Sequence, residues 1–292
     1  MIRPSEFIHP EDEAALRQLE SIPGFPAIAK KVLELGYEKM QYGINMASSI
    51  RLSPTQLPNI YNHLPPICEK LGIDEPEFYL EMNPFPNACT SGDTRIFIQV
   101  TSGLLEMMDD EELDAVLAHE CGHILCHHVL YNMVAQYLSM GLDKLGILGA
   151  VAKPVEYALL YWSRKAELSC DRCGSIITSP EVVARTMARL AGGPKKLTAS
   201  LDLHEWAKQA DLYDEIRNDG LWNKTLQIAV TMGLDHPFSA VRVREVMKWG
   251  ESAQYKNLMQ NLHMQSSGMK CPRCHKAVSE SWAYCKHCGM KL

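Results

Sequence analysis

Two histidines and a glutamate stand close together near the middle of the chain, in the order His119-Glu120-Cys121-Gly122-His123. In a helix four residues make about one turn, so the two imidazoles would share a face and hold one zinc ion between them. The carboxylate of Glu120, next to the first histidine, could then accept a proton from a zinc-bound water. The pattern therefore predicts the catalytic motif of a metallopeptidase.

The sequence around this motif is typical of a helix, as the chemistry requires. The acidic run at 109–112 offers an N-cap and an acidic first turn, and apolar residues recur at helical spacing after it. The alternative is that both histidines are ordinary, partly exposed polar residues of a helix. The position of Glu120 within the motif favours the metal site instead.

Zinc hydrolases commonly use three protein ligands and leave a fourth position for water. The best candidate for the third ligand is Glu167, which lies in another segment that is expected to be helical. Asp171 follows four residues later and would share its helix face, where it could accept a ring N–H from a ligating histidine. From the residues alone, a solvated charged face formed with Arg164, Lys165 and Arg172 is the favoured alternative.

Several separated motifs, taken in order, resemble the zinc metallopeptidase family that includes the heat-shock protease HtpX and the CAAX prenyl endopeptidases. The matching stretches lie at 87–88, 96–98, 102–105, 112–120 and 164–167, with Asp171 and Gly174, and then at His236-Pro237 with Arg242. Together they span roughly residues 75 to 250. The resemblance implies an α+β fold that is mostly helical, with a zincin-like metallopeptidase core and a small sheet.

The same resemblance implies roles for individual residues. His119, His123 and Glu167 would bind the catalytic zinc, and Glu120 would act as general base and proton shuttle. His236 and Arg242 would support the site, either by stabilising the oxyanion or by fixing the glutamate ligand.

The resemblance also implies a substrate cleft beside the segment 87–100. Asn87 and Ala88 would flank this cleft, and the strand-like residues 95–100 would belong to an edge to which an extended peptide adds as a further strand. Cys89 departs from the family, in which a larger apolar residue is common at this position. A buried small side chain is the favoured interpretation of Cys89.

Four cysteines near the end of the chain form a second metal motif. Cys271 and Cys274 make one C-x-x-C pair, and Cys285 and Cys288 make another after ten intervening residues. Four thiolates at this spacing predict a structural zinc ribbon that folds only with its metal bound. The chain is therefore expected to hold two zinc ions, one catalytic and one structural.

The net charge of the chain helps to decide which kind of partner the zinc ribbon would bind. Its basic and aromatic side chains could meet a nucleic acid or an acidic partner, but the chain as a whole has 29 Lys and Arg against 35 Asp and Glu, a net charge of −6. Protein interaction or a purely structural role is favoured over nucleic-acid binding.

The remaining six cysteines show no disulfide framework, which favours the cytoplasm or another reducing compartment. Cys170 and Cys173 form a third C-x-x-C, interpreted as helix residues because no second pair matches them. The first residues lack a signal-peptide core. Charged residues and Pro154 interrupt the most apolar segment, 142–162, so no transmembrane span is expected, although a peripheral membrane contact stays an alternative.

The periodicity predicts helices at 11–20, 27–48, 54–71, 182–190 and 203–218, with the third interrupted by prolines. The expected organisation is an N-terminal helical region at 1–75 packed on the core, a metallopeptidase core at 76–250, a helix end and linker at 251–268, and the ribbon at 269–292. This length suits one medium domain with a small tail.

Two functions are consistent with these sequence features. The favoured one is a zinc-dependent endopeptidase that acts on peptides or unfolded proteins in quality control or processing. The alternative is a catalytically silent zinc-binding adaptor that uses the protease core and the ribbon for protein interaction. The presence of Glu120 favours the enzyme, because a structural zinc site needs no base.

Overall fold

The computed structural model describes residues 2–34, 36–139, 152–218 and 238–266, together with 271–274, 278, 282–285 and 288–292. The fold is mostly helical with one small mixed sheet, as the sequence predicts. The chain divides into two compact units, residues 1–247 and 248–292. Among the residues described, no helix has the length and apolar character that crossing a bilayer requires.

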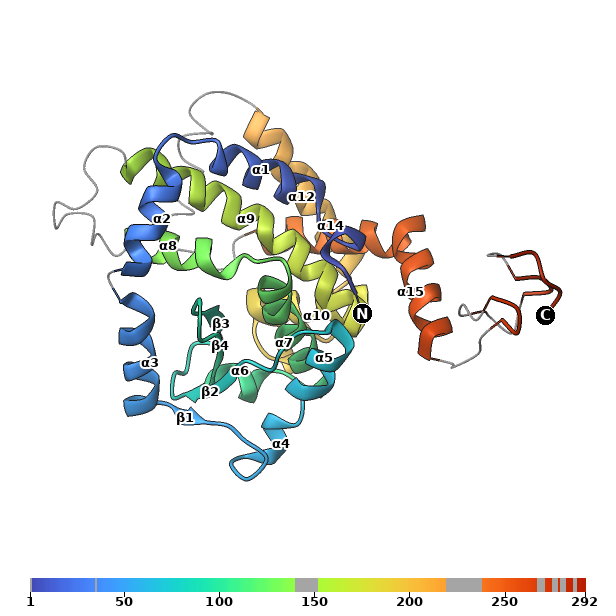
Figure 1. Ribbon diagram of the computed structural model, residues 1–292, viewed down its shortest axis with the longest axis horizontal. Helices are drawn as coiled ribbons and strands as arrows, with labels where there is room; N and C mark the ends of the chain where they lie inside the picture. The colour runs from blue at the N-terminus through green and yellow to red at the C-terminus, as the bar shows by residue number, and fades with distance from the viewer. Residues whose placement is uncertain are drawn as a thin grey trace. The chain divides into compact units, whose positions relative to one another are not determined.

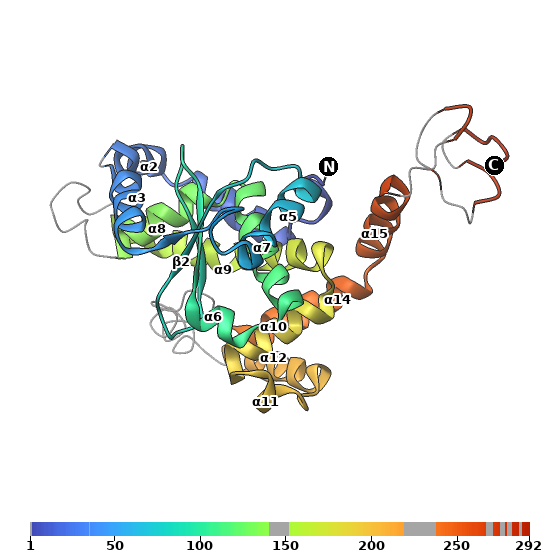
Figure 2. The same cartoon turned by 90° about the horizontal axis from the view of Figure 1, so that it is seen from below.

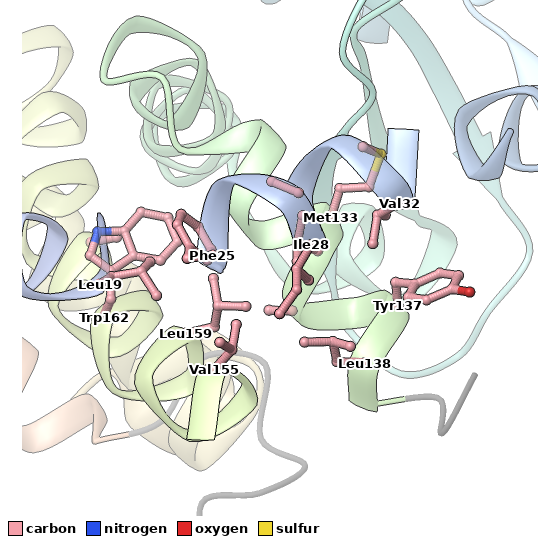
Figure 3. Close-up of a cluster of buried hydrophobic side chains, with 14 of the residues drawn as sticks. Leu19, Phe25, Ile28, Val32, Met133, Tyr137, Leu138, Val155, Leu159 and Trp162 are labelled. Carbon is pink, nitrogen blue, oxygen red and sulfur yellow. The ribbon is translucent and has the colours of Figure 1, made fainter. Parts of the chain in front are cut away.

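One hydrophobic core cluster lies among four helices of the first unit. These are α1 (Pro10–Glu20), α2 (Phe25–Glu34), α8 (Val129–Ser139) and α9 (Ala152–Ile177). Figure 3 shows Leu19, Phe25, Leu159 and Trp162 meeting in this cluster, and all four are buried. Burial of these side chains fixes the N-terminal helices against α8 and α9.

The helix expected at 27–48 is two helices, so that prediction was wrong at its centre. The second of them, α3 (Tyr37–Ser48), begins after Gly36, which has a left-handed φ of +74°. A residue other than glycine would be strained in this conformation, and the change of direction ends α2. The prolines at 58 and 65–66 begin two further short helices, α4 (Pro58–Tyr61) and α5 (Leu64–Leu71).

In the part of the chain that the structure describes, the sheet has four strands in the order β1-β2-β4-β3. β1 (Ile50–Arg51) pairs antiparallel with β2 (Glu77–Glu81), which pairs parallel with β4 (Phe97–Thr101). β3 (Ala88–Ser91) pairs antiparallel with β4 and, among the described residues, forms an edge of the sheet. The expectation that residues 95–100 lie at the edge was wrong, because β4 is paired on both sides, with β2 and with β3. In Figures 1 and 2 the strands run between α3 on one side and α5 and α7 (Asp110–Leu125) on the other.

A second apolar cluster joins α7 to two later helices. Ala115 of α7 packs with Val183 and Met187 of α10 (Pro180–Gly192) and with Val243 and Val246 of α14 (Ser239–Glu251). The remaining elements of this unit are the 3-10 turn η1 (Pro4–Glu6) and the helices α6 (Ser102–Met107), α11 (Lys195–Thr198) and α12 (Leu203–Asn218). Through this cluster α10 and α14 are anchored to the helix that carries the histidine motif.

The second unit contains α15 (Ala253–Ser266) and the segment with the four terminal cysteines. Trp249 and Tyr255 pack edge to face, with ring centroids 5.8 Å apart. In the cysteine segment an antiparallel bridge joins Tyr284 to Lys291, and Gly289 adopts a left-handed φ of +71°. This local geometry is that of a tight knuckle around Cys285 and Cys288.

Candidate metal centre

Helix α7 carries His119, Glu120 and His123, and all three side chains are buried. The helix begins with a capping box, in which Asp109 Oδ1 accepts from the N–H of Glu112 at 3.1 Å and Glu112 Oε2 accepts from the N–H of Asp109 at 3.2 Å. The predicted helix is therefore confirmed, and its start is locked by side chains of the acidic run.

Two glycines let α9 approach α7 closely, and the two helices lie side by side in Figure 1. A Cβ at Gly122 of α7 would lie 3.0 Å from Cys173 Cβ and 3.2 Å from Cys170 Cα. On the other helix, a Cβ at Gly174 would lie 3.2 Å from the carbonyl oxygen of Ala115. Because neither glycine has a side chain, the acidic residues of α9 reach the histidines of α7.

This approach brings both predicted acidic residues to the histidines. His119 Nε2 lies 3.4 Å from Glu167 Oε2, and His123 Nε2 lies 3.4 Å from Glu167 Oε1. On the other side of its ring, His119 Nδ1 lies 3.0 Å from Asp171 Oδ1. The charged face that the residues alone favoured for Glu167 and Asp171 is not solvated, since both carboxylates are buried.

The distances suit a shared metal ion. Ligand atoms 2.0 to 2.1 Å from a tetrahedral zinc lie about 3.3 to 3.4 Å apart, which matches the two ring-to-carboxylate distances. The donor set, two imidazoles and a carboxylate, is one that zinc hydrolases use. His119, His123 and Glu167 therefore fit a zinc ion, with Asp171 placed to hold the ring of His119.

Arg242 of α14 completes the charges of this cluster. Its Nη1 lies 2.9 Å from Glu167 Oε2, and its Nε and Nη2 donate to the two oxygens of Asp171 at 2.8 and 2.6 Å. Burial alone would raise the pKa of Asp171, but the charge and hydrogen bonds of Arg242, with those of His119, lower it below its usual value. Arg242 thus lies where it can fix the carboxylate of Glu167.

The electrostatics of the two histidines differ. Burial lowers the pKa of a histidine, yet the charge of Glu167 and the hydrogen bond that His119 donates to Asp171 outweigh it and raise the pKa of His119 to about 10. For His123, burial dominates and lowers the pKa. The carboxylates therefore make the face of His119 a favourable place for a cation.

One further ligand group lies here that the sequence interpretation did not assign. Ligand atoms of His119, His123 and Cys170 all lie within 4.8 Å of one another. Burial raises the pKa of the Cys170 thiol well above its usual value, which favours the neutral form, and its Sγ lies 3.7 Å from His128 Nδ1. Glu167 faces Nε2 of both His119 and His123 and is the better candidate for a third donor.

Glu120 points to the sheet and is held there by a residue that the sequence did not indicate. Thr90 of β3 donates from Oγ1 to Glu120 Oε2 at 2.6 Å and also contacts the carbonyl oxygen of Glu120 at 3.2 Å. A single threonine in a strand carries no sequence signal for this role. The hydrogen bond connects the edge strand to the helix of the histidine motif.

A pocket that is partly open to solvent lies against this group and holds about 430 Å³ of empty space, open solvent included. Asn87 and Ala88, predicted from the resemblance to flank a cleft, line it together with His119 and Glu120. Its other walls come from α6, α7, α9, α10 and α14 and are mostly apolar, including Leu104, Val116, Val183, Met187 and Leu190. The cavity thus places an apolar surface beside the carboxylate of Glu120.

The predicted site residue His236 lies outside the described residues.

The four terminal cysteines do meet, and their sulfur atoms all lie within 4.8 Å of one another. The Cys271–Cys288 and Cys274–Cys285 sulfur pairs are each 3.6 Å apart, close to the roughly 3.8 Å expected for thiolates 2.3 Å from a tetrahedral zinc. A hydrogen bond from the backbone of Cys274, against the effect of burial, lowers the pKa of Cys271 to about 6. This donor set fits a closed structural zinc site.

Comparison with known proteins adds an independent line of evidence. The model of peptidase family M48 matches residues 58–250. A protein of Arabidopsis thaliana named plastoglobule-localized metallopeptidase 48, chloroplastic, is 34% identical over 271 residues, covering 91% of this chain and 78% of that protein. A protease HtpX homolog of Tropheryma whipplei (strain Twist) is 26% identical, covering 60% of this chain and 73% of that protein. A protease HtpX homolog of Ralstonia pickettii (strain 12J) is 22% identical, covering 73% of this chain and 81% of that protein. No solved structure gives a significant match.

Proposed function

Since the chain belongs to peptidase family M48, a family of metallopeptidases, we propose that it is a zinc-dependent endopeptidase that hydrolyses peptide bonds in proteins. One observation carries the proposal. Glu120 is buried between the two histidines of its motif, is held by Thr90, and lines a cavity with an apolar wall. A site that only stored a metal would need neither the carboxylate nor the cavity.

In this proposal His119, His123 and Glu167 hold the zinc, which when bound lowers the pKa of a water to about 7 and polarises the scissile carbonyl. Glu120 accepts the proton of the attacking water and delivers it to the leaving amine nitrogen, so no covalent intermediate is needed. Asp171 accepts the Nδ1 hydrogen of His119 and keeps its Nε2 available.

We place Arg242 in a positioning role rather than at the oxyanion. Its guanidinium is occupied by Glu167 and Asp171, so it fixes the glutamate ligand and balances the charge of the two buried carboxylates. His236 remains our candidate for the group that stabilises the oxyanion, on the resemblance alone.

The substrate side of the proposal rests on β3. It is an edge strand of the described sheet, the kind of strand to which an extended peptide can add, and Asn87 and Ala88 at its start line the cavity. Main-chain hydrogen bonds depend little on the amino-acid sequence of the peptide. The apolar wall of the cavity would select an apolar side chain near the cleaved bond. Peptides or unfolded proteins, in protein processing or quality control, are therefore the proposed substrates.

We propose a structural zinc for the four terminal cysteines, with a protein partner as the use of the ribbon and no role in nucleic-acid binding. The proposed location is the cytoplasm or another reducing compartment. All ten cysteines carry free thiols in the described structure, and four of them would have to stay reduced to bind zinc.

The test compares two substitutions of the same chemical kind on one helix. Glu120→Gln should lower casein cleavage by about 10²- to 10⁴-fold, the usual contribution of a general base, while the zinc content per chain stays unchanged. Glu111→Gln, on the exposed face of α7, should cleave like the wild type. Equal cleavage by the wild type and Glu120→Gln, with zinc present in both, would favour the silent adaptor.

A further inference from the structure

Behind His123, on the side away from Glu167, lies a buried polar group that the proposed mechanism does not use. It consists of Asp12 from α1, His128 immediately before α8, and Trp162 and Ser169 from α9. The carboxylate of Asp12 lies beside the ring of His128, and the ring of Trp162 contacts both of them. Ser169 contacts Asp12 through its hydroxyl. Asp12, His128 and Trp162 are each completely buried. Polar groups so deep in a protein are costly unless they are satisfied, so this arrangement calls for a role.

The carboxylate of Asp12 is held rigidly. Trp162 Nε1 donates to Oδ1 at 3.0 Å, and Ser169 Oγ donates to Oδ2 at 2.5 Å. The same Ser169 hydroxyl accepts from the N–H of His9 at 2.9 Å, which ties the start of α1 to α9. Asp12 therefore presents a fixed negative charge to whatever lies in front of it.

What lies in front of it is His128. Its Nε2 is 3.2 Å from Asp12 Oδ2. Among the described residues no well-aligned hydrogen bond satisfies this buried nitrogen, and the carboxylate of Asp12 is the acceptor that lies beside it. A carboxylate beside Nε2 favours the form of the ring that carries a hydrogen there, and the neutral ring then has its lone pair on Nδ1. That Nδ1 lies 3.3 Å from Nδ1 of His123.

His123 needs an acceptor at that point. To bind a metal through Nε2, its ring must carry the hydrogen on Nδ1 and donate it. Besides His128, the polar group that the described residues place near Nδ1 is the amide nitrogen of Asn132 at 3.4 Å, and a nitrogen of this kind donates rather than accepts. The oxygen of Asn132 already accepts from Ser163 at 3.2 Å. His128 is thus the group that can take the hydrogen.

We propose that Asp12 and His128 are positioning residues for the metal ligand His123: Asp12 fixes the tautomer of His128, and His128 Nδ1 accepts the Nδ1 hydrogen of His123, which leaves His123 Nε2 for the metal. The inference rests on the proposed function, since it takes His123 as a zinc ligand. The carboxylate of Asp171 contacts the ring of His119 directly, whereas the carboxylate of Asp12 acts on His123 through the ring of His128. Asp12 lies outside residues 58–250, so the N-terminal helix supplies part of the site from beyond the matched family segment.

The test uses neighbouring histidines as a matched pair. His128→Asn removes the relay, whereas His127→Asn changes an exposed ring one residue earlier. Asparagine suits both positions, because His127 has a left-handed φ of +59° and His128 precedes the first turn of α8. The readout is the chelator concentration that removes zinc from the full-length protein, with His123→Ala identifying which zinc belongs to the catalytic site.

We expect His128→Asn to weaken binding of that zinc by about 10- to 100-fold, the usual effect of losing a residue that orients a metal ligand, and His127→Asn to bind like the wild type. Asp12→Asn should weaken it similarly, with the exposed Glu13→Gln as its control. If either main variant folds poorly, Ser169→Ala removes only one donor to Asp12 and should give a smaller loss in the same direction. Thermal unfolding of the zinc-free proteins separates an effect on the metal from an effect on the fold.

Two results would overturn the inference, and they differ. If His123→Ala loses a zinc but His128→Asn and Ser169→Ala retain wild-type affinity, the relay is wrong and the proposed function stands. If His123→Ala retains all the zinc of the wild type, the metal site itself is wrong, and the relay falls with it. A second readout is ¹⁵N NMR of the zinc-loaded protein, in which a hydrogen on Nε2 of His128 supports the relay and a hydrogen on its Nδ1 contradicts it.

Discussion

At the scale of single residues, the most specific contact in the candidate site is the hydroxyl of Thr90 on the carboxylate of Glu120. Both groups are buried, so the hydrogen bond is shielded from water, and it fixes which oxygen of the carboxylate faces the strand. A general base acts only in the correct orientation, which makes this orientation part of the site.

We predict that Thr90→Val lowers kcat for peptide cleavage by roughly 10- to 100-fold, because a hydrogen bond to a charged group is worth about 1.5–3 kcal/mol. Valine has nearly the same shape and suits a strand, so the fold and the zinc content should not change. Steady-state kinetics with zinc analysis checks this, and Thr90→Ser, which keeps the hydroxyl, is the control. Unchanged kcat in Thr90→Val would show that Glu120 needs no such support.

The histidine motif of this site could be predicted from the sequence, whereas the residues that pack around it could not. The histidine motif is local, since its three chemical groups stand within five residues on one helix, and periodicity indicates such a helix. Thr90, Cys170 and Asp12 come to the site only through tertiary packing. The hydrogen bond between Trp162 and Asp12, for example, spans 150 residues, and no local pattern encodes it.

At the scale of elements, the site depends on the close contact between α7 and α9. We predict that Gly122→Ala lowers both the unfolding temperature and the zinc content, because the added methyl meets the backbone and Cβ of α9 at 3.0 to 3.2 Å and pushes Glu167 away from the histidines. Calorimetry and metal analysis measure the two effects.

The control for that change is Gly43→Ala in α3. A Cβ at Gly43 has no atom within 4 Å, so alanine should stabilise the helix by about 0.5–1 kcal/mol. Opposite signs for the two substitutions would separate the helix contact from helix propensity. If Gly122→Ala also proved stabilising, the close approach of α7 and α9 would not be required.

A second contact between elements joins α3 to the turn between β3 and β4. Glu38 accepts from the backbone N–H groups of Asp93 and Thr94 at 2.5 and 2.8 Å, and from the Thr94 hydroxyl at 2.7 Å. Burial alone would raise the pKa of Glu38, but these hydrogen bonds, above all that of the Thr94 side chain, lower it.

A lowered pKa means that the ionised carboxylate stabilises the fold above its ordinary pKa, and that this contribution is lost as the pH falls through the lowered value. We therefore predict that Glu38→Gln unfolds at lower urea concentration than the wild type at pH 7, and that the gap narrows below about pH 4. Urea denaturation at a series of pH values measures it. A gap that stays constant with pH would mean that the charge of Glu38 contributes nothing.

The sequence predicted the type of most helices better than their ends. Helices at 11–20 and 203–218 were found within one residue, because apolar periodicity and end signals agree there. The break at Gly36 was missed, since a glycine within a helical pattern does not by itself say whether the chain turns. The pairing of β2 with β4 in parallel was not predictable from either strand alone.

At the scale of the whole molecule, the chain forms two compact units, and the second contains a cluster of four cysteines that packs with Val278, Trp282 and Met290. We predict that Cys285→Ser lowers the zinc content by one ion per chain and unfolds only the C-terminal segment, while the far-ultraviolet circular dichroism stays nearly unchanged. Cys89→Ser, the same chemical change in β3, should keep all the zinc. Loss of helical signal in Cys285→Ser would show that the first unit depends on the ribbon.

Arg242 also has a consequence for the way in which the protein is made. It joins the site from 71 residues beyond Asp171, so a chain still on the ribosome already contains both carboxylates and both histidines but lacks the cation that balances them. At 5 to 20 residues per second, about 4 to 14 s separate the synthesis of the two partners. A nascent chain should therefore be unable to cut itself or its neighbours before Arg242 has been synthesised and has reached the two carboxylates.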